Sequence, residues 1–218
     1  IGAGPCGLSA AGFLREGGLS VTVFDARGQA GGMTTTTLPQ YRSLPKVVRK
    51  DVARLEAAGV DFRFGQAAGT DFTLESLRQD GHDYIIVAVG AQKGMPLGVE
   101  GQDAAGVMDG MDFLRLARDG ELKTLQGRVG VVGGGDVAMD CARVAKRLGG
   151  DVTVIYRRTM EEMPAHREEV VGLLKEGIPI RELSAPKAVE ARDGKVTGLR
   201  CSAMQLGEPD ESGRRRPV

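Results

Sequence analysis

The sequence contains no tryptophan, and aromatic residues make up only 4 % of its 218 positions. Lys and Arg together number 29, and so do Asp and Glu, so no net charge attracts nucleic acid or an anionic membrane surface. The apolar runs are far shorter than the roughly 20 residues that cross a bilayer, and no signal-peptide pattern opens the chain. We therefore expect no nucleic-acid partner and no membrane insertion.

Cysteine and histidine are also scarce. The three cysteines, Cys6, Cys141 and Cys201, form no C-x-x-C pair and no zinc-ligand spacing, which argues against a redox dithiol. His82 and His166 stand apart in the sequence from any nucleophile or cluster of metal ligands. These absences argue against a hydrolase or a metalloenzyme. They favour a reduced, cytoplasmic protein with no metal site.

Glycine, by contrast, is abundant, at 33 residues. Gly2, Gly4 and Gly7 form a G-x-G-x-x-G motif, and after a helical stretch an alternating strand at 21–24 ends in Asp25. The first glycine permits a tight turn, the second lets backbone approach a pyrophosphate, and the third allows close helix–strand packing. The motif alone also fits an ordinary glycine turn. The carboxylate of Asp25, 23 residues after Gly2, can accept hydrogen bonds from both ribose hydroxyls and repels a 2′-phosphate, so we expect FAD or NAD here.

The same pattern recurs 131 positions later. Gly133, Gly135 and Ala138 form a G-x-G-x-x-A variant, again between a predicted strand and a predicted helix. Where the first unit has its acid, this one has Arg157 and Arg158. Two guanidinium groups suit a 2′-phosphate by charge and by bidentate geometry, although a solvated basic pair is the plainer interpretation. Together with the glycine turn, the arginines predict NADPH.

Periodicity places the remaining elements. The sequence predicts helices over 44–58, 74–79, 113–117, 137–148 and 166–175, and strands over 60–64, 84–89, 128–132 and 152–156. Two further β-like runs flank an Asp193-Gly194 turn, and Arg214–Arg216 is interpreted as a solvated turn. Residues 94–106 resemble a connector, so the predicted domains are 1–103, for FAD, and 104–218, for NAD(P)H. Only Ile1 precedes the first turn, which suggests a segment of a longer protein that also continues beyond Val218.

Two different dinucleotides on one chain suggest a redox pair, with hydride passing from NADPH to FAD. This transfer needs no protein acid or base, so we nominate no catalytic side chain. Two other functions stay open: a nucleotide-binding or interaction domain without turnover, and a flavin monooxygenase.

The sequence resembles a family that includes the NADPH-dependent small subunit of glutamate synthase, the FAD/NADPH part of dihydropyrimidine dehydrogenase, and related bacterial iron–sulfur flavoproteins. The segments that carry the resemblance are, in order, IGAGPCGLSAA, FDARGQAGGM, LPQYR, AVGAQKG, VVGGGDVAMDCAR, IYRRTMEEMPA and LGEPDESGRRRPV. It implies an α/β fold of two Rossmann-like domains, with the NADPH domain inserted in the FAD domain. It further implies 4Fe-4S clusters on segments outside this chain, and a redox partner domain or subunit that receives electrons.

The resemblance also implies site residues. Those for FAD are Gly2, Ala3, Gly4, Pro5, Gly7, Asp25, Gly32, Met33 and Arg42. Those for NADPH are Gly133, Gly135, Asp136, Val137, Ala138, Arg157 and Arg158. In the family, the FAD site is closed by a Gly-Asp motif that follows the inserted domain, and no such segment follows that domain within the 218 residues. We therefore expect this chain to bind NADPH better than FAD.

Overall fold

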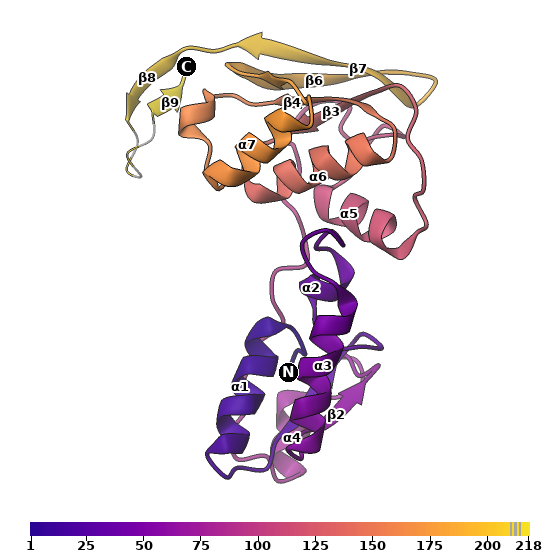
Figure 1. Cartoon of the computed structure of the whole chain (residues 1–218), viewed down its shortest axis with the longest axis vertical. Coiled ribbons are helices and arrows are strands. Elements are labelled where there is room, and N and C mark those ends of the chain that lie inside the picture. Colours follow the sequence, from indigo (N-terminus) through magenta and orange to yellow (C-terminus); the bar gives the residue numbers. More distant parts are fainter. Residues whose placement is uncertain (210, 212, 214) are drawn as a thin grey trace. The chain divides into compact units, whose positions relative to one another are not determined.

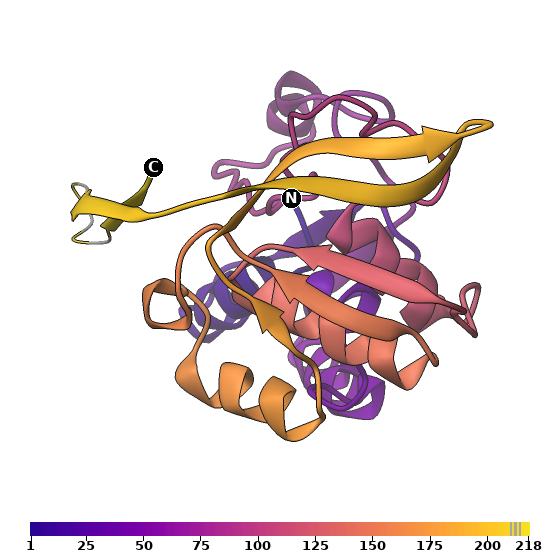
Figure 2. The same ribbon diagram turned by 90° about the horizontal axis from the view of Figure 1, so that it is seen from above.

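The computed structural model describes residues 1–209, 211, 213 and 215–218, and divides into two compact units, Ile1–Gln92 and Lys93–Val218. Figures 1 and 2 show the elements of both. Each unit has a hydrophobic cluster of its own. The junction between the units comes earlier in the chain than the expected boundary between 103 and 104. The assignment of one nucleotide to each domain stays a prediction.

The first unit contains a short parallel sheet with helices. Its elements are α1 (Pro5–Glu16), β1 (Thr22–Asp25), α2 (Met33–Thr36), α3 (Pro45–Ala57), β2 (Asp61–Phe64) and α4 (Leu74–Gln79). Proline at the first helical position suits the start of α1, and Gly18, with φ of +84°, follows its end. β1 pairs with β2 in parallel, so that Asp25 lies opposite Phe64 at the carboxyl edge.

The core of the first unit consists of alanine and valine side chains from the glycine turn, α1, β1, the loop before α2 and the residue before β2. Its buried members are Ala3, Ala11, Val23, Ala30 and Val60. Because Ala3 and Ala11 have small side chains, the backbone of the glycine turn and of α1 comes close to β1. The core thus fixes the start of α1 at the carboxyl end of the sheet.

One prediction for the first unit needs correction. Residues 84–89 form no strand. The Ile1 ammonium group donates to the Ile86 carbonyl, and the Ile1 carbonyl accepts from the Ala88 N–H, but these two contacts do not extend into a ladder. Thr34–Thr36 lie in the one-turn helix α2, where the Thr36 and Thr37 N–H groups donate to the carbonyls of Gly32 and Met33 at 3.1 and 3.0 Å.

The second unit contains a three-stranded parallel sheet in the order β3-β4-β5. Its elements are α5 (Gly110–Asp119), β3 (Arg128–Val132), α6 (Asp136–Arg147), β4 (Asp151–Ile155), the 3-10 helix η1 (Met160–Glu162), α7 (Arg167–Lys175), β5 (Ile180–Arg181), β6 (Ser184–Arg192), β7 (Lys195–Ala203), β8 (Leu206–Pro209) and β9 (Arg215–Pro217). In Figure 1, α5, α6 and α7 lie on one side of this sheet, and the β6–β7 ribbon lies on the other.

The helix α6 organises this unit. Its buried face packs on β3 and β4, and the largest fully buried side chains among the described residues gather there: Met139, Val152, Val154, Leu173 and Ile178. Arg143 of α6 bonds to Glu169 and to Glu176 at 2.8 Å each, and Arg147 bonds to Glu176 at 2.8 Å. Burial opposes ionisation of Glu176, but the hydrogen bonds from the two arginines outweigh it and lower the pKa of its carboxyl. This network fixes α7 beside α6.

Two hairpins complete the second unit. The Asp193-Gly194 turn joins β6 to β7 as predicted, with positive φ of 52° and 74° at its two residues, as a type I′ turn requires. β8 pairs with β9. Arg215 and Arg216 are therefore strand residues, which corrects the expectation of a solvated turn, while Arg214 lies outside the described residues.

Candidate functional site

The first and third glycines of the N-terminal turn are required by the fold itself. Gly2 has φ of +105°, and a Cβ there would lie 2.3 Å from the Ala88 carbonyl oxygen. A Cβ on Gly7 would lie 1.8 Å from the carbonyl oxygen of Gly2. The close approach of backbone to backbone excludes any side chain at these two positions.

The second glycine is different. Gly4 is the N-cap of α1, with φ of −78° and ψ of −178°, a conformation open to any residue. The only atom near a Cβ built there is the Gly32 Cα, at an ordinary distance of 3.8 Å. No side chain caps α1, and its first residue, Pro5, has no N–H. The fold thus leaves room over this helix start, and a phosphate group fits there.

Asp25 ties the end of β1 to the glycine turn. Its Oδ2 accepts the Ala3 N–H at 2.7 Å, and its Oδ1 accepts the Arg27 N–H at 2.8 Å. A carboxylate has about four acceptor positions, so each oxygen can accept a further donor such as a ribose hydroxyl. Asp25 therefore shapes the turn as well as offering the predicted ribose contact.

The loop that carries the predicted Gly32 and Met33 lies against the same turn. The Gly31 N–H donates to the Ala3 carbonyl at 2.7 Å, and a Cβ on Gly32 would be 2.8 Å from the Gly4 Cα. Met33 follows directly as the first residue of α2. Arg42 is the last residue of the turn at 39–42, and its guanidinium lies 5.8 Å from the ring centroid of Tyr41.

In the second turn, at Gly133–Gly135, the fold again requires two of the glycines and leaves the one that caps the helix free of close neighbours. Gly133 has φ of +142°, and a Cβ on Gly134 would lie 2.5 Å from the ring of Tyr156, so the fold requires both glycines. Gly135 has φ of −95° and ψ of 174°, and nothing lies within 4 Å of a Cβ built there. It caps α6, whose start has no side-chain cap. Val137 is 45 % exposed beside this open space, and Ala138 is buried beneath it.

One wall of the second turn comes from the segment after β4. The Ala165 N–H donates to the Gly134 carbonyl at 3.1 Å. The next residue, His166, donates its backbone N–H to Asp136 Oδ1 at 2.9 Å, and its Nδ1 lies 2.8 Å from Asp136 Oδ2. Sequence reasoning missed His166 as a site residue, because 30 positions separate it from Asp136 and no local spacing connects them.

The two arginines at the end of β4 lie in different environments. Arg157 is exposed, whereas Arg158 is only 5 % exposed and its Nε donates to the Arg215 carbonyl at 2.7 Å. Arg215 in turn bonds through Nε to Glu162 at 3.2 Å. Arg158 thus anchors β9 at this strand end. The guanidinium of Arg157 is the more accessible of the two to a 2′-phosphate.

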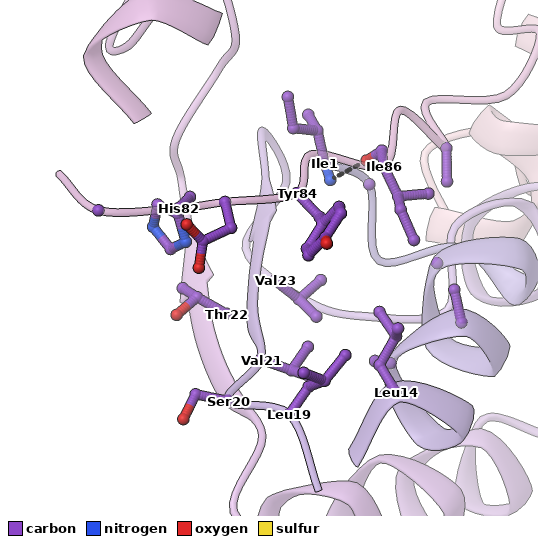
Figure 3. A pocket seen from close by; sticks show the side chains of 17 residues that line it. Ile1, Leu14, Leu19, Ser20, Val21, Thr22, Val23, His82, Tyr84 and Ile86 are labelled. Atoms are coloured by element: carbon purple, nitrogen blue, oxygen red, sulfur yellow. Dashed lines mark hydrogen bonds between the residues drawn. The ribbon is translucent and has the colours of Figure 1, made fainter. Parts of the chain in front are cut away.

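Cys141 is buried in the second unit, and a cavity lies in the first. Desolvation by burial, helped by Asp140 and Asp109, raises the pKa of the Cys141 thiol to about 12. A cavity of about 450 Å³ in the first unit lies between α1, β1 and the 81–88 segment. Figure 3 shows that apolar side chains such as Leu14, Val21 and Ile86 face it.

Within the described residues, no group of three or more His, Cys, Asp or Glu side chains is arranged to hold a metal ion. In the same part of the chain, every helix is too short or too polar to cross a membrane.

The fold and the two turns define an α/β protein with two dinucleotide-binding motifs, and solved structures share this fold. FprA from Mycobacterium tuberculosis, determined in complex with NADPH, matches with a TM-score of 0.80 at 18 % identity, over 100 % of this chain and 65 % of that one. Thioredoxin reductase from Lactococcus lactis matches with a TM-score of 0.66 at 23 % identity, over 100 % of this chain and 72 % of that one. The 218 residues cover part of their two-domain arrangement.

The chain belongs to the pyridine nucleotide-disulphide oxidoreductase family, whose sequence profile matches residues 1–211. It is thus a pyridine nucleotide–FAD oxidoreductase domain of the glutamate synthase-like type, which confirms the resemblance drawn from its motifs.

Two curated relatives illustrate the relationship. The NADP(+)-dependent formate dehydrogenase subunit beta of Moorella thermoacetica is 43 % identical over 222 residues, which are 100 % of this chain and 31 % of the relative. The glutamate synthase [NADPH] small chain of Escherichia coli K12 is 35 % identical over 229 residues, or 99 % of this chain and 48 % of the relative. The chain therefore spans a third to a half of their length.

Proposed function

We propose that the chain is an NADPH-dependent flavin oxidoreductase module. FAD binds at the first glycine turn, NADPH binds at the second, and electrons pass onward to an iron–sulfur centre or a partner subunit. The single observation that carries the proposal is that the fold itself does not require glycine at Gly4 or at Gly135. Both positions keep a glycine that the backbone conformation does not require and that no neighbouring atom requires. A ligand that approaches the backbone closely supplies the reason.

The first turn suits FAD. Its pyrophosphate would lie on the backbone of Ala3, Gly4 and Pro5, with Gly32 and Met33 on the other side. Asp25 would accept the ribose hydroxyls, and its negative charge disfavours a nucleotide that carries a 2′-phosphate. FAD bound there would cover the surface that the 1–92 unit leaves open at Gly4.

The second turn suits NADPH. Its diphosphate would lie over Gly135, Val137 and Ala138, at the start of α6, where the backbone N–H groups and the helix dipole favour negative charge. Arg157 would bind the 2′-phosphate. Arg158 would support this contact from beneath by holding the end of β4 against β9.

Hydride transfer from NADPH to FAD needs no acid or base from the protein side chains. When bound, FAD supplies the hydride acceptor, and NADPH is the donor. The chain contributes the two turns that orient the nucleotides. The names of two relatives, a formate dehydrogenase subunit beta and the NADPH-Fe(3+) oxidoreductase subunit beta of Geobacter sulfurreducens, support a partner subunit for this chain as well.

Two alanine variants test the proposal. Gly4→Ala should weaken FAD binding and leave NADPH binding unchanged, and Gly135→Ala should do the reverse, because each new methyl occupies one phosphate position. Both variants should fold normally, since neither Cβ meets a close neighbour. Gly28→Ala is the matched control, because that loop position is equally open. Equilibrium dialysis against each nucleotide measures binding, and circular dichroism measures folding. Unchanged NADPH affinity in a folded Gly135→Ala variant would refute the second site.

A further inference from the structure

An acidic residue stands where the diphosphate of NADPH is proposed to bind. Asp136 follows Gly135 directly and is the first residue of α6. A carboxylate at this end stabilises an empty helix, because it interacts favourably with the partial positive charge of the N-terminus. The same carboxylate repels a diphosphate that approaches the same N–H groups. A nucleotide site with this residue needs a means of keeping the acid away from the phosphates.

His166 provides that means. It is the N-cap of α7, and it bonds both carboxylate oxygens of Asp136, one with its backbone N–H at 2.9 Å and the other with ring Nδ1 at 2.8 Å. Two contacts to two oxygens fix the rotation of the carboxylate as well as its position. Since a carboxylate only accepts, Nδ1 carries the hydrogen in this pair.

The backbone that carries His166 is itself held in place. Ala165, the preceding residue, donates its N–H to the Gly134 carbonyl at 3.1 Å, so consecutive residues bond to both sides of Gly135. At the other end of α7, Glu176 bonds to the arginines of α6. The histidine therefore approaches Asp136 from a rigid support. Its imidazole stays largely accessible, with 77 % of the side chain exposed.

We propose that His166 is a positioning residue for nucleotide binding, which holds the Asp136 carboxylate against α7 and partly offsets its charge, so that the diphosphate can reach the start of α6. This inference rests on the proposed NADPH site at the second turn. Without the imidazole, Asp136 Oδ2 loses its 2.8 Å contact, so the carboxylate can rotate toward the N–H groups of its own helix, where it competes with the phosphates. Replacing Asp136 by Asn removes the charge and with it the need for the histidine.

A double-mutant cycle in the full chain tests this. His166→Ala should raise the dissociation constants of NADPH and NADH alike by roughly 5- to 30-fold, because the diphosphate is common to both. Asp136→Asn should bind at least as tightly as the original chain, and Asp136→Asn/His166→Ala should match Asp136→Asn. His166→Asn, which keeps a donor near the position of Nδ1, should recover most of the affinity. Thermal unfolding of every variant shows that the fold is retained.

Each outcome bears on the inference. A loss from His166→Ala that is equally large with and without the Asp136→Asn substitution would overturn it, because the histidine would then act independently of the acid. A loss of affinity in a stable Asp136→Asn variant would also overturn it, and that variant decides the matter if His166→Ala fails to fold. Failure of the original chain to bind NADPH would refute the proposed function instead. The two failures are thus distinguishable.

Discussion

The proposed preference of the second unit for NADPH should depend on Arg157. Its guanidinium is exposed at the end of β4, beside the turn that would hold the diphosphate, whereas that of Arg158 is buried and donates to a carbonyl. A 2′-phosphate carries up to two negative charges near neutral pH, so its contact with Arg157 is charge-assisted. Such contacts contribute about 1.5–3 kcal/mol, and exposure to solvent moves the expectation to the lower end of that range or just below it. Arg157→Ala should therefore weaken NADPH binding by about 1–2 kcal/mol, or roughly 5- to 30-fold.

The assay compares two nucleotides that differ in one group. Calorimetric titration of the Arg157→Ala variant should show the loss for NADPH and almost none for NADH, which lacks the 2′-phosphate. The difference should shrink as salt is added, because an exposed contact is screened. Arg128→Ala is the charge-matched control, since Arg128 is exposed at the opposite end of β3 from the turn. Equal losses for both nucleotides would refute the assignment of Arg157 to the 2′-phosphate.

Two further predictions concern stability. Gly7→Ala should destabilise the fold by roughly 2–4 kcal/mol in urea titrations followed by circular dichroism, because its Cβ would lie 1.8 Å from a carbonyl oxygen; a stability equal to that of Gly28→Ala would contradict the geometry of the turn. Glu176 has a lowered pKa in the folded chain, so its ion pairs stabilise the fold above the ordinary glutamate pKa, and this contribution is lost as pH falls through the lowered value. Glu176→Gln should therefore reduce stability near neutral pH and flatten its decline in acid, and an unchanged acid profile would argue against the network.

The features that the sequence predicted best depend on neighbouring residues. A glycine motif specifies a strand–turn–helix unit through contacts a few positions apart, and the positive φ of Gly2 and Gly133 follows from that geometry. The Asp193-Gly194 hairpin is local in the same sense. Helices α3, α6 and α7 likewise begin and end close to the predicted residues, since their apolar spacing and terminal signals lie within each segment.

The features that the sequence did not predict depend on distant partners. Residues 84–89 have the composition of a strand, but a strand needs a neighbour along its length, and composition does not show whether one is paired there. Arg157 and Arg158 look equivalent in sequence, and only the arrival of β9 buries one of them. The pairing of His166 with Asp136 similarly arises from the packing of α7 on α6. Tertiary contacts of this kind leave no periodic signal.

The central claim is that the chain carries two separate dinucleotide sites, one of which selects NADPH. Equilibrium dialysis of the chain against saturating NADPH, with and without an excess of FAD, tests this most directly. We predict one bound NADPH per chain in both conditions, and bound FAD as well where FAD is added, because the two nucleotides occupy the separate turns of Gly4 and Gly135. Loss of NADPH in proportion to the FAD bound would place both nucleotides on one turn and contradict the claim.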